Sequence, residues 1–299
     1  MNLERADSTA ANRTVVTACV ICGTRGPPAE RARVRSNLRA FCHETFEVWR
    51  CGRCRSLHAS EDVDLPSYYA RYPFHGTSID WRLRVMYKNL LRRLERSGLR
   101  HPQRILDYGC GGGHFVDYLR LRNYDAVGYD EYSSTFARPE LLQGRYDFLL
   151  SQDVVEHVSD PVALLRRFDR LVEPGGLIAI GTPNASAIDL RRAEEHVHAL
   201  HMPFHRHIFA KDALIEASTS LGWQRQGYYP SMYNNTRVPL INPRFILHYL
   251  RCFDNNLDLG FEPIRLSLRL LSPVTLFWAL FGSFFAPETD VMVVFRRSG

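Results

Sequence analysis

The sequence predicts an α/β protein built on a parallel, doubly wound sheet. From residue 104 onward, apolar runs of strand length alternate with amphipathic stretches of helix length, and a cluster of glycines follows the first run. Strands that alternate with helices favour parallel pairing, because parallel neighbours are joined by crossover connections. The stretch DPVALLRRFDRLVEPGG at 160–176 also has an Asp cap, a proline at the first helical position and glycines at its end, which are helix boundary signals.

The remaining elements follow from hydrophobic periodicity. We expect strands at 104–109, 124–130, 146–152, 177–184, 222–230 and 290–297. We expect helices at 81–98, 114–123, 160–176 and 211–222. A long insertion at 231–289 separates the last strand from the others.

Composition limits the classes of partner. The chain has 299 residues, and its 45% hydrophobic and 23% charged content is typical of a folded globular protein. The net charge of +6 comes from scattered arginines, which disfavours a nucleic-acid partner because such a partner needs a clustered basic surface. Seven cysteines, four of them in CxxC pairs, and a first segment without an apolar core predict a reducing, cytoplasmic compartment and no secretory signal.

One stretch raises the question of a membrane. Residues 270–287 are strongly apolar, but Pro273 and Pro287 leave an uninterrupted span shorter than the roughly 20 residues that cross a bilayer. We therefore expect a buried or interfacial helix. Two interpretations stay open for this part of the insertion: peripheral membrane association through 264–287, or a substrate-domain or dimer surface.

The glycine cluster does not fit the dinucleotide fingerprint G-x-G-x-x-G, because its third position holds His114 or Val116. What remains is an acidic residue at the strand end, Asp107, with glycines at alternate positions after it, and Asp130 at the end of the next strand. A carboxylate beside the loop would repel a pyrophosphate and suits an amino group, while the second carboxylate suits ribose hydroxyls. A nucleoside with a cationic amino-acid tail, such as S-adenosylmethionine, meets both conditions.

Four motifs in order resemble those of the class I S-adenosylmethionine-dependent methyltransferases: ILDYGCGGGHF, YDAVGYDEY, YDFLLSQDVVEHVSDP and LVEPGGLIAIGTPN, within about 104–229. The resemblance implies a Rossmann-like sheet of seven strands and S-adenosyl-L-methionine as cofactor. It also implies a set of cofactor-binding residues: Asp107, Gly109, Gly111, Gly113, Asp130, Ser151, Gln152 and Asp153. In this resemblance Asp107 and the backbone of Gly109 and Gly111 lie beside the methionine tail, Asp130 holds the ribose, and residues 151–153 line the floor near adenine and the sulfonium. The segment between Asp130 and Tyr146 is short for the third strand of that family.

Two cysteine pairs predict a metal site near the N-terminus. Cys19 and Cys22 are separated by 28 residues from Cys51 and Cys54, and four thiolates favour tetrahedral zinc. Because four ligands leave no open position, this Zn(2+) would be structural; a redox dithiol and an iron–sulfur cluster are the alternatives. The arrangement resembles the N-terminal four-cysteine knuckle of methyltransferases that act on sugars, cell-surface molecules and natural-product scaffolds. We therefore expect a disordered segment at 1–17, a small zinc-ribbon-like module at 18–62, a helical linker and cofactor lid at 63–100, and the methyltransferase domain at 101–299.

Two histidines are the candidate catalytic bases. His157 follows Glu156 after the fourth strand, where a base would face the crevice, although it could instead cap the loop. His205 lies in HVHALHMPFHRHIF, a histidine-rich segment for which a substrate-contacting lid, a solvated loop and a metal site are all considered. The tyrosines of LPSYYARYPF, Tyr68, Tyr69 and Tyr72, either close the cofactor pocket or pack against a helix.

The resemblance thus implies an S-adenosylmethionine-dependent methyltransferase. The knuckle points to a sugar or glycan intermediate of envelope or secondary metabolism as the acceptor. The alternatives are a quinone or polyketide-like small molecule as acceptor, a non-catalytic cofactor-binding adaptor, and an RNA-modifying enzyme. The oligomeric state is left open.

Overall fold

A mixed sheet of six strands forms the centre of the protein. The computed structural model describes residues 17–72, 79–260, 262–265 and 267–299. In these residues the sheet has the order β11-β12-β9-β8-β6-β7. Its strands are β6 (Arg104–Tyr108), β7 (Asp125–Tyr129), β8 (Tyr146–Gln152), β9 (Val172–Pro183), β11 (Gln224–Tyr229) and β12 (Asp290–Arg296). β7, β6, β8 and β9 pair in parallel, whereas β12 runs antiparallel to β9 and to β11. The alternation of strands and helices thus predicted the parallel part of the sheet.

The expectation of seven strands was wrong for the described part of the chain. Residues 130–145 connect β7 to β8 through a short 3-10 helix, η2 (Pro139–Gln143), and no strand forms there. A further parallel strand would need its own crossover of a dozen or more residues, and the connection has no room for one. A second boundary also differs, because the helix expected to continue to Gly176 ends at Leu171 and β9 starts directly at Val172.

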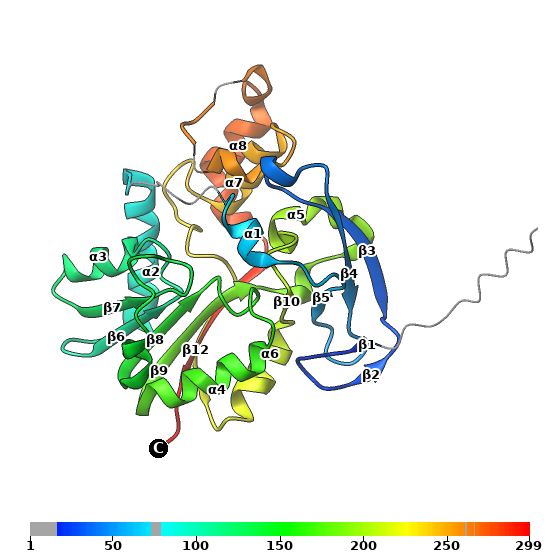
Figure 1. The fold of residues 1–299 in the computed structure, drawn as a ribbon. Helices are drawn as coiled ribbons and strands as arrows, with labels where there is room; N and C mark the ends of the chain where they lie inside the picture. The colour runs from blue at the N-terminus through cyan, green and yellow to red at the C-terminus, as the bar shows by residue number, and fades with distance from the viewer. Residues whose placement is uncertain (1–16, 73–78, 261, 266) are drawn as a thin grey trace, which may run out of the picture.

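Helices cover both faces of the sheet (Figure 1). α2 (Trp81–Arg96) and α3 (His114–Arg120) pack on one face, and α4 (Pro161–Leu171) and α6 (Lys211–Thr219) pack on the other. β12 shows why both faces of the sheet need a cover. Met292 and Val294 pack into the core beneath α2 and α3, whereas Val293 and Phe295 pack into the core beneath α4 and α6. Successive side chains of a strand point to opposite faces, so a strand buried on both sides is apolar throughout.

The N-terminal part forms a small antiparallel sheet beside this domain (Figure 1). Its strands have the order β10-β5-β4-β3 and are β3 (Glu30–Arg35), β4 (Thr45–Arg50), β5 (Leu57–Ala59) and β10 (His207–Ile208); β1 (Thr17–Ala18) pairs separately with β2 (Arg25–Gly26), and η1 (Arg39–Phe41) precedes β4. Because β10 follows β9 in the chain, the small sheet includes a strand that belongs to the main domain in sequence. Residues 1–16 of the segment expected to be disordered lie outside the described residues, and Thr17 belongs to β1.

Short helices complete the edge of the molecule where the parallel strands end. α1 (Leu65–Tyr69) lies between the two sheets, and η3 (Ala185–Ala187), η4 (Leu190–Glu195) and α5 (Val197–Leu200) follow β9. The insertion carries α7 (Pro243–Arg251), η5 (Leu257–Gly260), η6 (Leu268–Leu270), α8 (Pro273–Phe281) and η7 (Gly282–Phe285), and it protrudes at the top of Figure 1. Within the described residues, no helix combines the length and the apolarity needed to cross a bilayer.

Candidate functional site

The glycine loop between β6 and α3 adopts a backbone that only glycine accommodates easily. Gly109, Gly111 and Gly113 all have positive φ, at 84°, 54° and 75°. A Cβ on Gly109 would lie 2.2 Å from Cγ2 of Val154, and one on Gly113 would lie 2.1 Å from the ring of Phe136. The loop is therefore packed against its neighbours on one side while its backbone turns tightly at the strand end.

Two carboxylates flank this loop, as the sequence predicts. Asp130, directly after β7, accepts hydrogen bonds from the backbone N–H groups of Gly111 and Tyr132, each at 2.9 Å. Asp107, on β6, is 5% exposed, and its burial together with the nearby charge of Asp130 raises its pKa to about 7. A buried carboxyl of this kind is stabilised in its ionised form only when a cation lies beside it.

The end of β8 supplies polar groups that have no partner of their own. Within the described residues, no hydrogen bond reaches Ser151 Oγ or Gln152 Oε1, although both atoms are buried. Asp153 follows in the left-handed region at φ 54°, accepts a hydrogen bond from Gln152 Nε2, and has its pKa raised to about 7 by burial and by Asp290. We call residues 151–153 the floor of the site. Because buried polar atoms without a partner cost free energy, the floor is suited to a polar ligand.

The insertion contributes one group to this region that the sequence did not reveal. Tyr233 lies in the loop after β11, and Asn89 of α2 holds its backbone carbonyl at 2.7 Å. Burial raises the pKa of the Tyr233 phenol well above its usual value, with further contributions from Asp153 and Asp107. No pattern in 231–289 marks this tyrosine, because its position depends on how the insertion folds back over the strand ends.

A buried acid–histidine group lies next to the floor. Side-chain ligand atoms of Glu156, His157 and His205 all lie within 4.8 Å of one another. Glu156 Oε2 accepts a hydrogen bond from the Thr182 hydroxyl at 3.1 Å, and its Oε1 lies 3.9 Å from His205 Nε2. The histidine-rich segment therefore has an acidic neighbour. This neighbour is Glu156, from the loop after β8, rather than Glu194 or Glu195, which directly precede the segment in the chain.

Burial changes the protonation of all three groups. Desolvation raises the pKa of Glu156 well above its ordinary value, with Asp153 adding to the effect. Desolvation lowers the pKa of His205 to about 4 and lowers that of His157 further below its usual range. At neutral pH both imidazoles are therefore neutral, and burial favours the protonated form of the Glu156 carboxyl, since each charged form would be desolvated.

The two candidate bases differ in how their ring nitrogens are engaged. His157 Nδ1 lies 2.9 Å from the Tyr69 hydroxyl, and the ring also hydrogen-bonds the backbone of Phe204. His205 donates from Nδ1 to the Ala199 carbonyl at 2.8 Å, which leaves the lone pair on Nε2. His205 thus has a nitrogen that can accept a proton, whereas both nitrogens of His157 are occupied.

The segment 65–72, the aromatic lid, closes over these histidines. Tyr69 stacks on Tyr132 with ring centroids 4.6 Å apart, and both Tyr69 and Tyr72 pack edge-on against Phe204. Tyr72 bonds His201 Nε2 at 2.9 Å, and His201 Nδ1 lies 2.7 Å from Asn37 Oδ1. Tyr69 and Tyr72 thus contact the histidines, while Tyr68 packs on Phe41 and bonds Glu44, and a role in closing the cofactor pocket stays a prediction.

Comparison with known proteins decides the family of the central domain. Residues 79–225 match the family model described as a methyltransferase domain. This part of the chain is a methyltransferase domain. The match confirms the resemblance seen in the four motifs.

The curated relatives cover part of the chain. "Ubiquinone biosynthesis O-methyltransferase" of Cereibacter sphaeroides is 34% identical over 27% of this chain and 41% of its own. The proteins of that name from Sodalis glossinidius and Pseudomonas aeruginosa are 29% and 30% identical, over 43% and 30% of this chain. The chain spans 41% to 63% of the length of these three relatives.

Solved structures show a more distant likeness. The N-methyltransferase NodS of Bradyrhizobium japonicum in complex with S-adenosyl-L-homocysteine covers 78% of this chain and 98% of its own, at 12% identity and a TM-score of 0.43. An S-adenosylmethionine-dependent methyltransferase of Mesorhizobium loti covers 71% and 98%, at 15% identity and a TM-score of 0.43.

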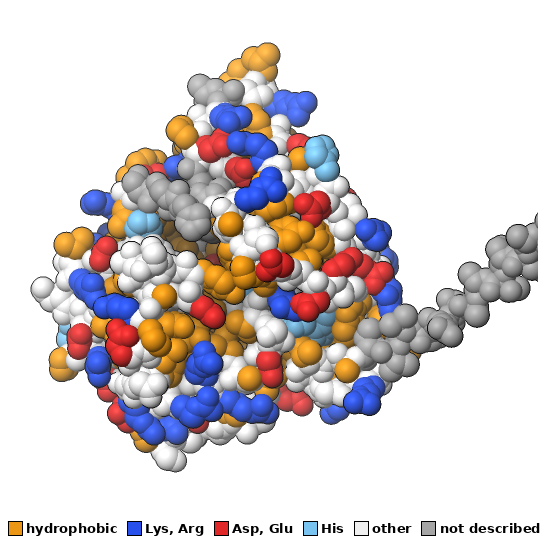
Figure 2. All heavy atoms as spheres, viewed as in Figure 1, with side chains coloured by type: hydrophobic (Ala, Val, Ile, Leu, Met, Phe, Trp, Pro, Cys, Tyr) orange, Lys and Arg blue, Asp and Glu red, His pale blue; other side chains and the backbone are white. Residues whose placement is uncertain are grey.

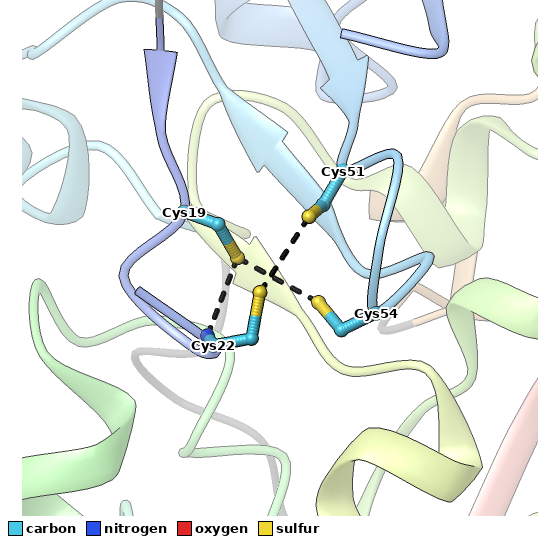
Figure 3. A group of neighbouring side chains, drawn as sticks. All are labelled: Cys19, Cys22, Cys51 and Cys54. Carbon is cyan, nitrogen blue, oxygen red and sulfur yellow. Dashed lines mark hydrogen bonds between the residues drawn. The ribbon is translucent and has the colours of Figure 1, made fainter. Parts of the chain in front are cut away.

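The four predicted cysteines come together beside the methyltransferase domain (Figure 3). Their sulfur atoms all lie within 4.8 Å of one another, with 3.6 Å between those of Cys19 and Cys54 and 3.7 Å between those of Cys22 and Cys51. Tetrahedral zinc with Zn–S bonds of about 2.3 Å requires S···S distances of about 3.8 Å. These two distances are thus close to those of a tetrahedral zinc site, and all seven cysteines are free of disulfides.

A pair of histidines connects this cluster to the methyltransferase domain. His58 Nε2 lies 3.2 Å from Cys19 Sγ, and its Nδ1 lies 3.0 Å from His207 Nδ1. His207 belongs to β10, and its backbone N–H bonds the carbonyl of Glu156 at 3.1 Å. The cysteine cluster is thus two side chains away from the acid–histidine group, a connection that sequence spacing did not indicate.

Proposed function

We propose that the protein is an S-adenosylmethionine-dependent methyltransferase that methylates a hydroxyl group on a flat, apolar acceptor of the quinol type. The observation that carries the proposal is the aromatic lid, which bonds His157 next to the neutral His205 and stacks through Tyr69 on Tyr132 at the Asp130 side of the glycine loop. The names of the curated relatives favour the quinone alternative over the sugar or glycan interpretation. Stacked rings at Tyr69, Tyr132 and Phe204 suit a planar acceptor.

The cofactor-binding residues fit the chemistry of S-adenosyl-L-methionine. The Asp107 carboxylate would bind the amino group, and the remaining lone pairs of Asp130 would accept from the ribose hydroxyls. Ser151 Oγ and Gln152 Oε1, which have no partner among the described residues, would gain one from the ligand. The ammonium and sulfonium charges would in turn offset the cost of ionising Asp107 and Asp153 in a buried place.

When bound, the cofactor supplies an electrophilic methyl group, so the protein's main tasks are orientation and removal of the acceptor proton. His205 is the group we assign to the proton, because Nδ1–H is fixed on Ala199 and Nε2 faces Glu156. A proton accepted by Nε2 creates an imidazolium 3.9 Å from Glu156 Oε1, where the carboxyl would lose its own proton more readily. The pair thus shares the charge of the transferred proton.

His157 takes a positioning role in this proposal. Its bond to Tyr69 holds the aromatic lid in place, and its ring packs edge-on against His205 with centroids 4.7 Å apart. The lid and the base are thereby fixed relative to each other. A shift of the lid would displace both the acceptor ring and the imidazole that receives its proton.

We also propose that the four cysteines hold a structural Zn(2+). Their sulfur geometry supports it, and four thiolates leave no coordination site for a substrate. Thiol ligands of this kind suit the reducing, cytoplasmic compartment expected from the cysteine count. The methyltransferase domain reaches this site through His58 and His207.

Binding and transfer assays test the proposal in sequence. Calorimetric titration of the zinc-loaded protein should show binding of S-adenosylhomocysteine and none of NAD, whose pyrophosphate the Asp107 carboxylate would repel. Transfer of a labelled methyl group should then be measured on two panels, one of quinols and catechols and one of nucleotide-sugars and lipid-linked glycans. Transfer to the second panel alone would restore the glycan interpretation, and cofactor binding without transfer to either panel would favour the adaptor.

A further inference from the structure

The insertion presents an apolar surface to solvent at the outermost part of the molecule. We call residues 268–285 the apolar tip. Leu268, Leu271 and Phe284 are 84%, 80% and 71% exposed. Leu276, Phe281 and Phe285 are also exposed, and Figure 2 shows hydrophobic side chains at the top of the molecule, above α8. Contiguous exposed apolar side chains of this kind mark an interaction site.

The apolar tip is held firmly by α7. Ser272 caps α8 and Pro273 starts it, while Asn242 donates to the Trp278 carbonyl at 3.0 Å. His248 Nε2 lies 2.8 Å from Thr275 Oγ1, so Thr275 and Ala279 face inward and are buried. The opposite side of α8 therefore points outward as a consequence of specific contacts, and the apolar side chains have nothing to cover them among the described residues.

Charge distinguishes the kinds of partner. Residues 231–287 contain five arginines and three acidic residues, and no Asp or Glu lies between Glu262 and Glu288. The three acids are paired with arginines: Asp254 with Arg35, Asp258 with Arg39, and Glu262 with Arg39 and Arg265. In contrast, Arg269, within the apolar tip, is exposed and donates to the backbone carbonyl of Cys252, and Arg244 donates to the backbone carbonyl of Phe285. The surface around the tip is therefore cationic.

This combination fits an anionic lipid surface better than a second copy of the chain. Phenylalanine and leucine side chains on a short interfacial helix enter the headgroup region, and arginines at its border attract anionic headgroups. A two-fold dimer through the same patch would instead bring like-charged arginines together across the interface. No described helix crosses a bilayer, so the contact is with the surface of the membrane.

We propose that the apolar tip docks the protein onto anionic membranes and so gives the site access to a lipid-dissolved acceptor. The second half of this statement rests on the proposed function. The same insertion carries Tyr233 to the floor beside Asp153, and Leu257 to the small core around Phe204 on which the lid tyrosines also pack. The docking surface and the acceptor side of the site thus belong to one continuous piece of structure.

Vesicle co-sedimentation of the full-length, zinc-loaded protein tests the docking. We expect binding to vesicles of phosphatidylcholine with phosphatidylglycerol, weaker binding to phosphatidylcholine alone, and about a tenfold or greater loss in the double variant Phe281→Ser, Phe284→Ser. Leu121→Ser, at the residue that follows α3, is the matched control, because Leu121 is 80% exposed and lies outside the insertion. Arg269→Gln should reduce the preference for anionic vesicles.

Three results would overturn the docking. They are equal binding by the double variant and the wild type, no vesicle binding at all, and a wild-type dimer in sedimentation velocity that the double variant abolishes. All substituted side chains are exposed, and an unchanged melting temperature and S-adenosylhomocysteine affinity would show that each variant folds. Since cofactor affinity is measured without lipid, failure of the methyltransferase proposal is distinguished from failure of docking.

Discussion

The burial of Asp107 predicts that cofactor binding releases a proton. Its pKa is raised to about 7, mainly by desolvation, so about half of the molecules carry a neutral carboxyl at pH 7. The cofactor's amino group requires the ionised form. Between pH 8 and pH 6 the ionised fraction falls about tenfold, and the affinity for S-adenosylhomocysteine should fall by the same factor.

Calorimetry measures both quantities. Titrations at pH 7 in two buffers with different ionisation enthalpies should report about half a proton released per site, and titrations at pH 6 and pH 8 should give the affinity ratio. Asp107→Asn should bind weakly and lose most of the pH dependence. Asp153→Asn is the control, because the pKa of Asp153 is also about 7 and its removal leaves Asp107 to titrate. A wild-type affinity that is equal at pH 6 and pH 8 would refute the reasoning.

The same shift has a consequence for stability with the opposite sign. Because the folded pKa of about 7 exceeds the ordinary 3.8, the stability that neutral Asp107 provides is fully present below about pH 4 and is lost as the pH rises through 7. The difference of about three pKa units corresponds to at most about 4 kcal/mol at 1.36 kcal/mol per unit. Asp107→Asn should therefore raise the free energy of unfolding of the cofactor-free protein at pH 8 and change it little at pH 4. A variant that binds cofactor weakly and is also less stable at pH 8 would indicate a purely structural role.

Four further substitutions test separate parts of the site. His205→Gln should lower kcat by about 10²-fold or more with cofactor affinity unchanged, whereas His157→Gln should mainly raise the acceptor KM; equal effects on kcat would contradict the division of roles. Cys51→Ser should leave less than one zinc per chain by metal analysis and lower the melting temperature, and full zinc content in the purified variant would exclude it as a ligand. Gly109→Ala places a Cβ 2.2 Å from Val154 in a left-handed backbone, so it should weaken S-adenosylhomocysteine binding by about tenfold, which fluorescence titration would measure.

Local patterns predicted the elements that local physics determines. The strands around Asp107 and Asp130 and the cap at Asp160 were predicted near their observed positions, because apolar periodicity and capping depend on neighbouring residues. The seventh strand came from family resemblance, and the short connection after β7 has no room for it. The sequence predicted the glycine loop because a backbone with positive φ favours glycine, so the glycines mark its position.

Long-range contacts account for what the sequence did not reveal. Glu156 and His205 are far apart in the chain, and they meet where the backbone N–H groups of residues 206 and 207 bond the Glu156 carbonyl. Asn37 bonds both His198 and His201 from the side of the small N-terminal sheet, and Tyr233 arrives from the insertion. Asn37 and Tyr233 stand in no motif, since a side chain that completes a site from another segment needs no special spacing in sequence.

The N-terminal module is best understood as a support for the site. Arg50 is buried and donates to the backbone carbonyls of Ala185 and Ile188 after β9, so the small sheet fixes the loop that leads to the histidines. From the other direction, the cysteine cluster reaches His207 through His58. If Zn(2+) holds the four thiolates in place, it also holds His58, and through it the short strand whose backbone N–H bonds the Glu156 carbonyl. A metal distant from the reacting atoms would then contribute to activity by fixing where the base His205 lies, two residues before His207.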